Sequence, residues 1–121
     1  MPTYGSFGYG SAAYGANLAS AQQTFFAPQW SELGIKRAIV NYTGIAPLYS
    51  IFIRQQGDTE DVTYRIYGHA DGESPDLLQV VLGRAGISET VIGAHEFIEV
   101  EVEFITSIAD EFSVVGQERF A

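Results

Sequence analysis

The sequence predicts an all-β protein, an antiparallel β-sandwich of six to eight strands preceded by an extended N-terminal arm. Residues 96–104 alternate between apolar and acidic side chains, which is the pattern of a strand with one buried face. Residues 62–67 alternate with the same period of two. Turn residues separate several other short apolar runs, and no long helical pattern interrupts them. Short strands at this spacing are typical of a sandwich.

The two clearest strands also define which side chains face the core. In the strand at 96–104 the apolar residues are expected to point inward and the glutamates to point to solvent. In the strand at 62–67, Val62, Tyr64 and Ile66 share one face. A short helix is expected at residues 16–24, with Asn17 as its N-cap. The other expected strands cover residues 38–42, 48–54, 77–82, 90–92 and 112–115.

The first thirty-one residues differ in composition from the rest of the chain. Residues 1–31 contain no charged residue and no histidine, and an aromatic–glycine pair recurs four times near their start. Aromatic rings offer large, rigid contact areas, and glycine lets backbones approach closely. The chain is therefore divided into an arm, residues 1–31, and a sandwich body, residues 32–121. The arm residues expected to contact a partner are Tyr4, Phe7, Tyr9, Tyr14, Phe25, Phe26 and Trp30.

An apolar group surrounds Pro28 and consists of Phe25, Phe26 and Trp30. The sequence is compatible with two locations for this group. These side chains pack either on the core of their own body or on a neighbouring chain.

Charge excludes some classes of partner. The formal net charge is −9 and the pI is near 4.4, which disfavours contact with nucleic-acid phosphates. The chain has no cysteine, so disulfides and thiolate metal sites are impossible. The sequence shows no pattern of a signal peptide or of a membrane-spanning segment, so we expect a protein made in a cytoplasm that contacts neither nucleic acid nor membrane.

No pattern predicts a catalytic, metal or cofactor site. Residues 8–13 match G-x-G-x-x-A, but no strand fits before them, as a dinucleotide site requires. Same-face glutamates at 99, 101 and 103 stand about 6.5–7 Å apart, too far to share one Ca²⁺ easily. The acidic loops at 58–61 and 71–76 do not match a Ca²⁺-binding loop, and His69 and His95 lack a third ligand. We expect no metal, no cofactor and no enzymatic activity.

Two stretches resemble known proteins. The opening residues 1–15, with their Tyr-Gly and Phe-Gly pairs, resemble the N-termini of some small virion proteins of tailed bacteriophages, among them capsid decoration, tail and baseplate components. That resemblance implies a structural subunit whose arm docks on its neighbours. Residues 64–72, followed by Leu77-Leu78, are similar to a strand–turn–strand of discoidin-like and fibronectin-like sandwiches. This second resemblance supports a sandwich of the immunoglobulin, fibronectin or jelly-roll kind.

Three functions therefore remain open. The first is a non-enzymatic structural subunit of a bacteriophage virion, located in the virion and bound to other virion proteins or to copies of itself. The second is a ligand-binding sandwich, for example one that binds carbohydrate through a platform of exposed tyrosines. The third is a homo-oligomeric accessory protein with no viral link. The tyrosines considered for a platform are Tyr42, Tyr49, Tyr64 and Tyr67, with burial of Tyr64 in the core as the simpler interpretation.

Overall fold

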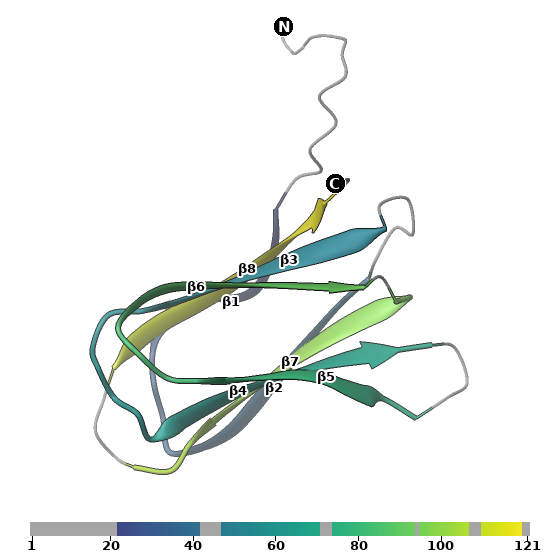
Figure 1. The fold of residues 1–121 in the computed structure, drawn as a ribbon. Helices are drawn as coiled ribbons and strands as arrows, with labels where there is room; N and C mark the ends of the chain where they lie inside the picture. Colours follow the sequence, from purple (N-terminus) through teal and green to yellow (C-terminus); the bar gives the residue numbers. More distant parts are fainter. Residues whose placement is uncertain (1–21, 42–46, 71–73, 94, 107–109, 120–121) are drawn as a thin grey trace, which may run out of the picture.

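The computed structural model describes residues 22–41, 47–70, 74–93, 95–106 and 110–119. These residues form eight strands and no helix (Figure 1). The described part therefore contains no helix that could cross a membrane. The strands are β1 (Gln23–Trp30), β2 (Gly34–Asn41), β3 (Leu48–Gln55), β4 (Val62–His69), β5 (Asp76–Leu82), β6 (Gly86–Gly93), β7 (Phe97–Phe104) and β8 (Glu111–Arg119).

The strands build two four-stranded sheets with the orders β1-β8-β3-β6 and β2-β7-β4-β5. Every neighbouring pair is antiparallel. Except at the β4–β5 hairpin, each connection crosses from one sheet to the other. Eight strands wound in this order form a jelly roll. The predicted all-β sandwich is confirmed, and its topology is the jelly-roll member of the expected group.

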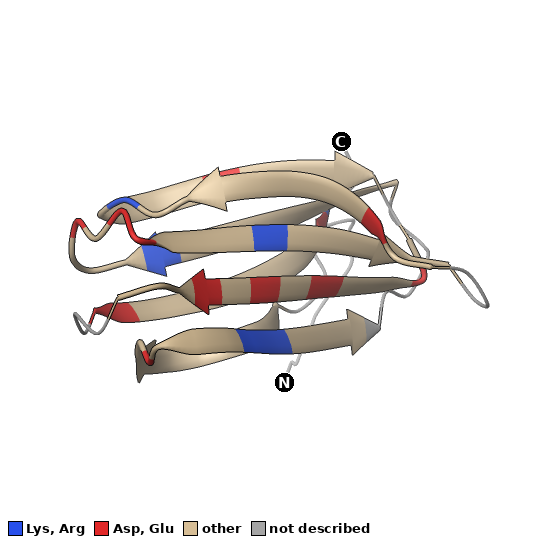
Figure 2. Cartoon of the chain, turned by 90° about the horizontal axis from the view of Figure 1, so that it is seen from below, with Lys and Arg blue, Asp and Glu red and all other residues tan. Residues whose placement is uncertain are grey.

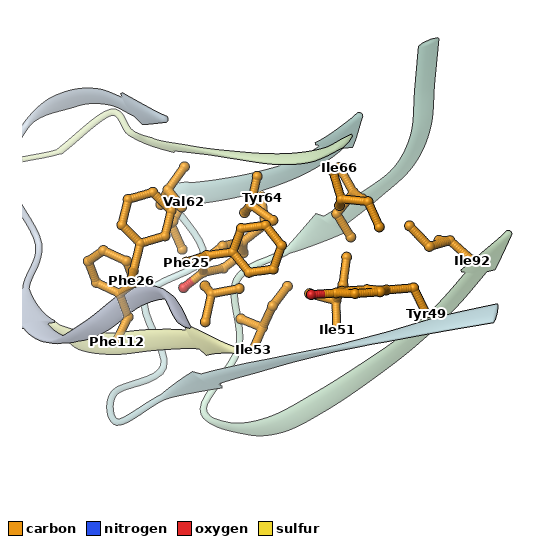
Figure 3. Close-up of a cluster of buried hydrophobic side chains, with 14 of the residues drawn as sticks. Phe25, Phe26, Tyr49, Ile51, Ile53, Val62, Tyr64, Ile66, Ile92 and Phe112 are labelled. Atoms are coloured by element: carbon orange, nitrogen blue, oxygen red, sulfur yellow. The ribbon is translucent and has the colours of Figure 1, made fainter. Parts of the chain in front are cut away.

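The core lies between the two sheets, where the inward faces of the strands meet (Figure 3). Alternate residues of β4 are buried, as the sequence pattern predicts, and so are Ile98, Val100, Val102 and Phe104 of β7. Phe112 of β8 contacts three other rings, those of Phe26, Tyr64 and Phe104, with centroid separations of 5.3–6.4 Å. Burial of this apolar surface is the main force that holds the sheets together.

The first described strand differs from the prediction. The helix expected at residues 16–24 is wrong at its C-terminal end, because Gln23 and Thr24 belong to strand β1. Residues 16–21 lie outside the described residues. Irregular pairing with β8, with register shifts on both sides of Phe26, accompanies a bend of β1. As a result, the adjacent side chains of Phe25 and Phe26 both enter the core. Residues 23–30, assigned to the arm by composition, are thus a sheet strand of the body.

Candidate interaction surfaces

Acidic residues recur at every second position of β7, which lies between β2 and β4, and both of these strands carry basic residues (Figure 2). Glu101 stands opposite Arg37 on one side and Arg65 on the other. Its carboxylate oxygens lie 2.8 Å from Arg37 Nη2 and 3.5 Å from Arg65 Nη1. Arg65 Nη1 also lies 2.9 Å from Glu103 Oε1. The two arginines therefore offset part of the negative charge of the glutamate row.

This pairing corrects the expectation that the glutamates point freely into solvent. Glu101 is only 6% exposed, because the arginines and Tyr67 cover it on the outer face. The Tyr67 hydroxyl donates to Glu101 Oε1 at 3.0 Å. Partial burial and this bond to a carboxylate raise the pKa of Tyr67. The sequence alone does not indicate this arrangement, because the partners on neighbouring strands are more than thirty residues apart in the chain.

The two histidines have separate polar neighbours. His69 Nε2 lies 2.8 Å from Glu99 Oε1, and His95 Nδ1 lies 3.3 Å from the carbonyl oxygen of Gly93. Within the described residues, no three side chains of the metal-binding types gather together.

Exposed apolar side chains concentrate at the edges of the two sheets. In the described residues, eight of the eleven exposed large hydrophobic side chains lie on the four edge strands. An edge strand leaves half of its backbone hydrogen-bonding groups without a strand partner, so apolar side chains there favour pairing with another chain. The eight residues are Trp30 on β1, Ile35 and Ile39 on β2, Leu77, Val80 and Leu82 on β5, and Ile87 and Val91 on β6.

The predicted contact residues have different positions. Tyr4, Phe7, Tyr9 and Tyr14 lie outside the described residues, so their role stays a prediction. Phe25 and Phe26, each 7% exposed, pack in the core of their own chain and offer almost no surface to a partner. Trp30 is 64% exposed at the end of the edge strand β1 and remains accessible.

The proposed tyrosine platform is wrong for the residues that can be placed. Tyr49 and Tyr64 are fully buried, and Tyr67 is engaged with Glu101, while Tyr42 lies outside the described residues. Tyr49 meets Phe25 edge-on inside the core. These tyrosines cannot present a shared stacking surface to a sugar. The core interpretation of Tyr64 is confirmed.

A buried polar cluster joins the two sheets near the 56–61 loop. The Tyr64 hydroxyl donates to Gln55 Oε1, and Gln55 Nε2 donates to Asp110 Oδ2 at 3.0 Å. The same amide donates to the carbonyl oxygens of Gly57 and Thr59, and the Gly57 amide donates to Asp110. Every polar atom named here has a partner inside the protein, so this cluster is structural rather than an open site.

Comparison with known proteins does not assign a family. No protein-family model matches the chain, and no curated protein matches it. One solved structure that matches is described as "Bacillus endospore appendages form a novel family of disulfide-linked pili"; it is 12% identical over 91% of this chain and 97% of that chain, with a TM-score of 0.42. This chain has no cysteine, so disulfide links of that kind cannot form here.

Proposed function

We propose that this chain is a non-enzymatic structural subunit that assembles with copies of itself or with other structural proteins. The observation that carries the proposal is the concentration of exposed apolar side chains on the edge strands of both sheets. A protein that works alone usually blunts its edges, because exposed apolar edges promote association. In a subunit, the same edges become contact surfaces.

We further propose that the assembly is a bacteriophage virion, with the protein in a decoration, tail, neck or baseplate position. The resemblance of residues 1–15 to virion proteins supports this step, and the net charge of −9 fits a protein kept away from packaged nucleic acid. In this proposal the arm docks on neighbouring subunits through Tyr4, Phe7, Tyr9 and Tyr14. An arm that orders on docking must bury enough aromatic surface to offset its loss of conformational entropy.

Deletion of residues 1–21 tests the role of the arm, since β1 begins at Gln23 and stays intact. The truncated chain is expected to keep its β-sheet circular dichroism and cooperative unfolding but to lose its place in the assembly. A variant with Tyr4, Phe7, Tyr9 and Tyr14 changed to serine, which keeps the arm's length, is expected to behave like the deletion. Normal assembly of both proteins would show that the arm has no docking role.

The virion assignment has its own test. An antibody against the sandwich is expected to label purified phage particles, and genes for capsid, portal or tail proteins are expected beside the coding sequence. Neighbouring genes for a non-viral appendage or surface layer would contradict the assignment to a virion. They would still agree with a role as a structural subunit.

A further inference from the structure

We propose that β2 of one copy pairs with β6 of a second copy, so that a sheet of one subunit continues into a sheet of the next. The inference rests on the proposed role as a structural subunit and specifies a contact made by the sandwich rather than by the arm. It comes from the geometry of the four edge strands and from the side chains they carry.

Two of the four edges carry features that discourage pairing, and two do not. Strand β1 contains Pro28 and two register shifts in its pairing with β8. Strand β5 has one register shift in its pairing with β4. Proline and bulges are devices that protect sheet edges. In contrast, β2 and β6 each pair one residue against one over all eight positions, without proline and without a shift. They are the open edges.

The two open edges also have matching side-chain patterns. Each strand is eight residues long and begins at a glycine with positive φ, Gly34 or Gly86. The outward residues at the second, fourth and sixth positions are apolar, charged and apolar in both strands, and the two central charges have opposite sign. They are Ile35, Arg37 and Ile39 on β2, and Ile87, Glu89 and Val91 on β6.

Pairing of β2 with β6 brings these patterns into register. With Arg37 opposite Glu89, the isoleucines of β2 lie beside Ile87 and Val91 on the same face. Because the pattern is symmetric about its central charge, this match holds for either strand direction. Opposite charges that face each other across two strands stabilise their pairing, and like charges in the same place destabilise it. Pairing β2 with a second β2, or β6 with a second β6, would place like charges opposite each other.

The contacts that the charged residues of β2 and β6 make within their own chain are compatible with this pairing. Arg37 Nη2 holds Glu101 at 2.8 Å, yet its side chain is 59% exposed and stands at the outer edge of its sheet. Glu89 is held by Arg119 at 2.8 Å, and both side chains are partly exposed. Lys36 lies on the opposite face of β2, where it donates to Gln29 Oε1 at 3.1 Å. This lysine is therefore engaged within its own chain.

The positions of the two edges predict how copies add together. Strand β2 lies on the side of the sandwich where Lys36 meets Gln29 of β1, and β6 lies on the other side, joined to β5 by residues 83–85. A contact between two different surfaces of identical subunits is heterologous, and repetition generates a ring or a filament. Each copy thus contributes β2 to one neighbour and β6 to the other.

Disulfide trapping tests this contact in the full chain, which has no cysteine of its own. Directly opposite residues on antiparallel strands have Cα atoms about 4.5–5.5 Å apart, within reach of a disulfide. The probes are two double variants, Ile39→Cys/Ile87→Cys for antiparallel pairing and Ile39→Cys/Val91→Cys for parallel pairing. Mild oxidation is expected to give one of them a ladder of dimers, trimers and larger species on non-reducing gels.

Matched variants define the contact. Each single-cysteine variant alone is expected to stay monomeric on the gel, while the matching pair mixed together gives dimers and nothing larger. The control Ile39→Cys/Leu77→Cys, whose positions on β2 and β5 are 55% and 53% exposed, is expected to give no ladder. Absence of a ladder from both probe variants, dimers of Ile39→Cys alone, or an equal ladder from the control would overturn the proposal.

The outcome is separable from that of the arm deletion. A ladder in the full chain together with normal assembly of the truncated chain supports the edge contact and removes the arm's role. Assembly that depends on the arm, with no ladder from either probe, overturns the edge contact and leaves the proposed function standing.

Discussion

The hydroxyl of Tyr64 donates a hydrogen bond of 2.9 Å to the side-chain oxygen of Gln55, joining β4 of one sheet to β3 of the other. Both side chains are buried. Tyr64→Phe keeps the ring in place but leaves the Gln55 oxygen without this donor. We expect the free energy of unfolding to fall by about 1–3 kcal/mol, measured by urea denaturation with an unchanged m-value. An unchanged midpoint would show that the bond does not stabilise the fold.

Gly116 on β8 is expected to be required because the ring of Tyr49 packs directly over it. A Cβ at this position would lie 2.5 Å from the Tyr49 hydroxyl oxygen and 2.8 Å from Phe25 Cε1. Gly116→Ala should therefore cost about 1–3 kcal/mol through overpacking. Gly93→Ala is the matched control, since nothing lies within 4 Å of its added methyl group. Equal thermal midpoints for the two variants would contradict this packing.

Glu101 is expected to contribute more than Glu103 to the charge pairing on the outer face. The Glu101 side chain is 7% exposed and contacts Arg37, Arg65 and Tyr67, whereas Glu103 is 30% exposed and contacts Arg65. We expect Glu101→Gln to cost about 1–2 kcal/mol and Glu103→Gln less than about 1 kcal/mol. Chemical denaturation of both variants measures the difference. A larger loss of unfolding free energy in Glu103→Gln than in Glu101→Gln would contradict the prediction that Glu101 contributes more.

Stability is expected to fall in alkali because of the buried tyrosines. Burial raises the pKa of the Tyr49 and Tyr64 hydroxyls above the usual value near 10, and the charges of Glu118 and Asp110 raise them further. In the unfolded chain these hydroxyls ionise near pH 10. The unfolded state therefore releases protons first, so the stabilising contribution is complete below about pH 9 and is lost as pH rises above about 10.

Urea midpoints between about pH 8 and pH 11 measure this decline. The decrease of the urea midpoint with rising pH should be smaller in Tyr64→Phe, because this variant has one buried hydroxyl fewer. A midpoint that does not change over this range, or an identical slope in Tyr64→Phe, would contradict the role of the buried tyrosines.

The local sequence pattern predicts the strands that have one buried face. It does not predict β1. Alternation in β4 and β7 indicates which side chains face the core, so the sequence predicts both strands and their inward residues. The residues at the start of β1 have helix propensity and a neutral composition that suggested an arm. Pairing with β8, some ninety residues away, overrides that local preference.

The charge pairing on the outer face and the buried polar cluster could not be predicted from the sequence alone. Nothing local indicates that Arg37 and Arg65 flank Glu101, or that Gln55 enters a buried cluster with Asp110, because these partners meet only after the sheets form. The similar patterns of β2 and β6 are present in the sequence. Their meaning appears only when the topology places both strands at sheet edges.

Sedimentation velocity of the 121-residue chain, over a range of concentrations at physiological salt, tests the central claim that this subunit assembles with copies of itself. The account predicts species much larger than the 13.2 kDa chain, increasing with concentration, and rings or filaments in electron micrographs of the same samples. A single 13.2 kDa species at every concentration would contradict it.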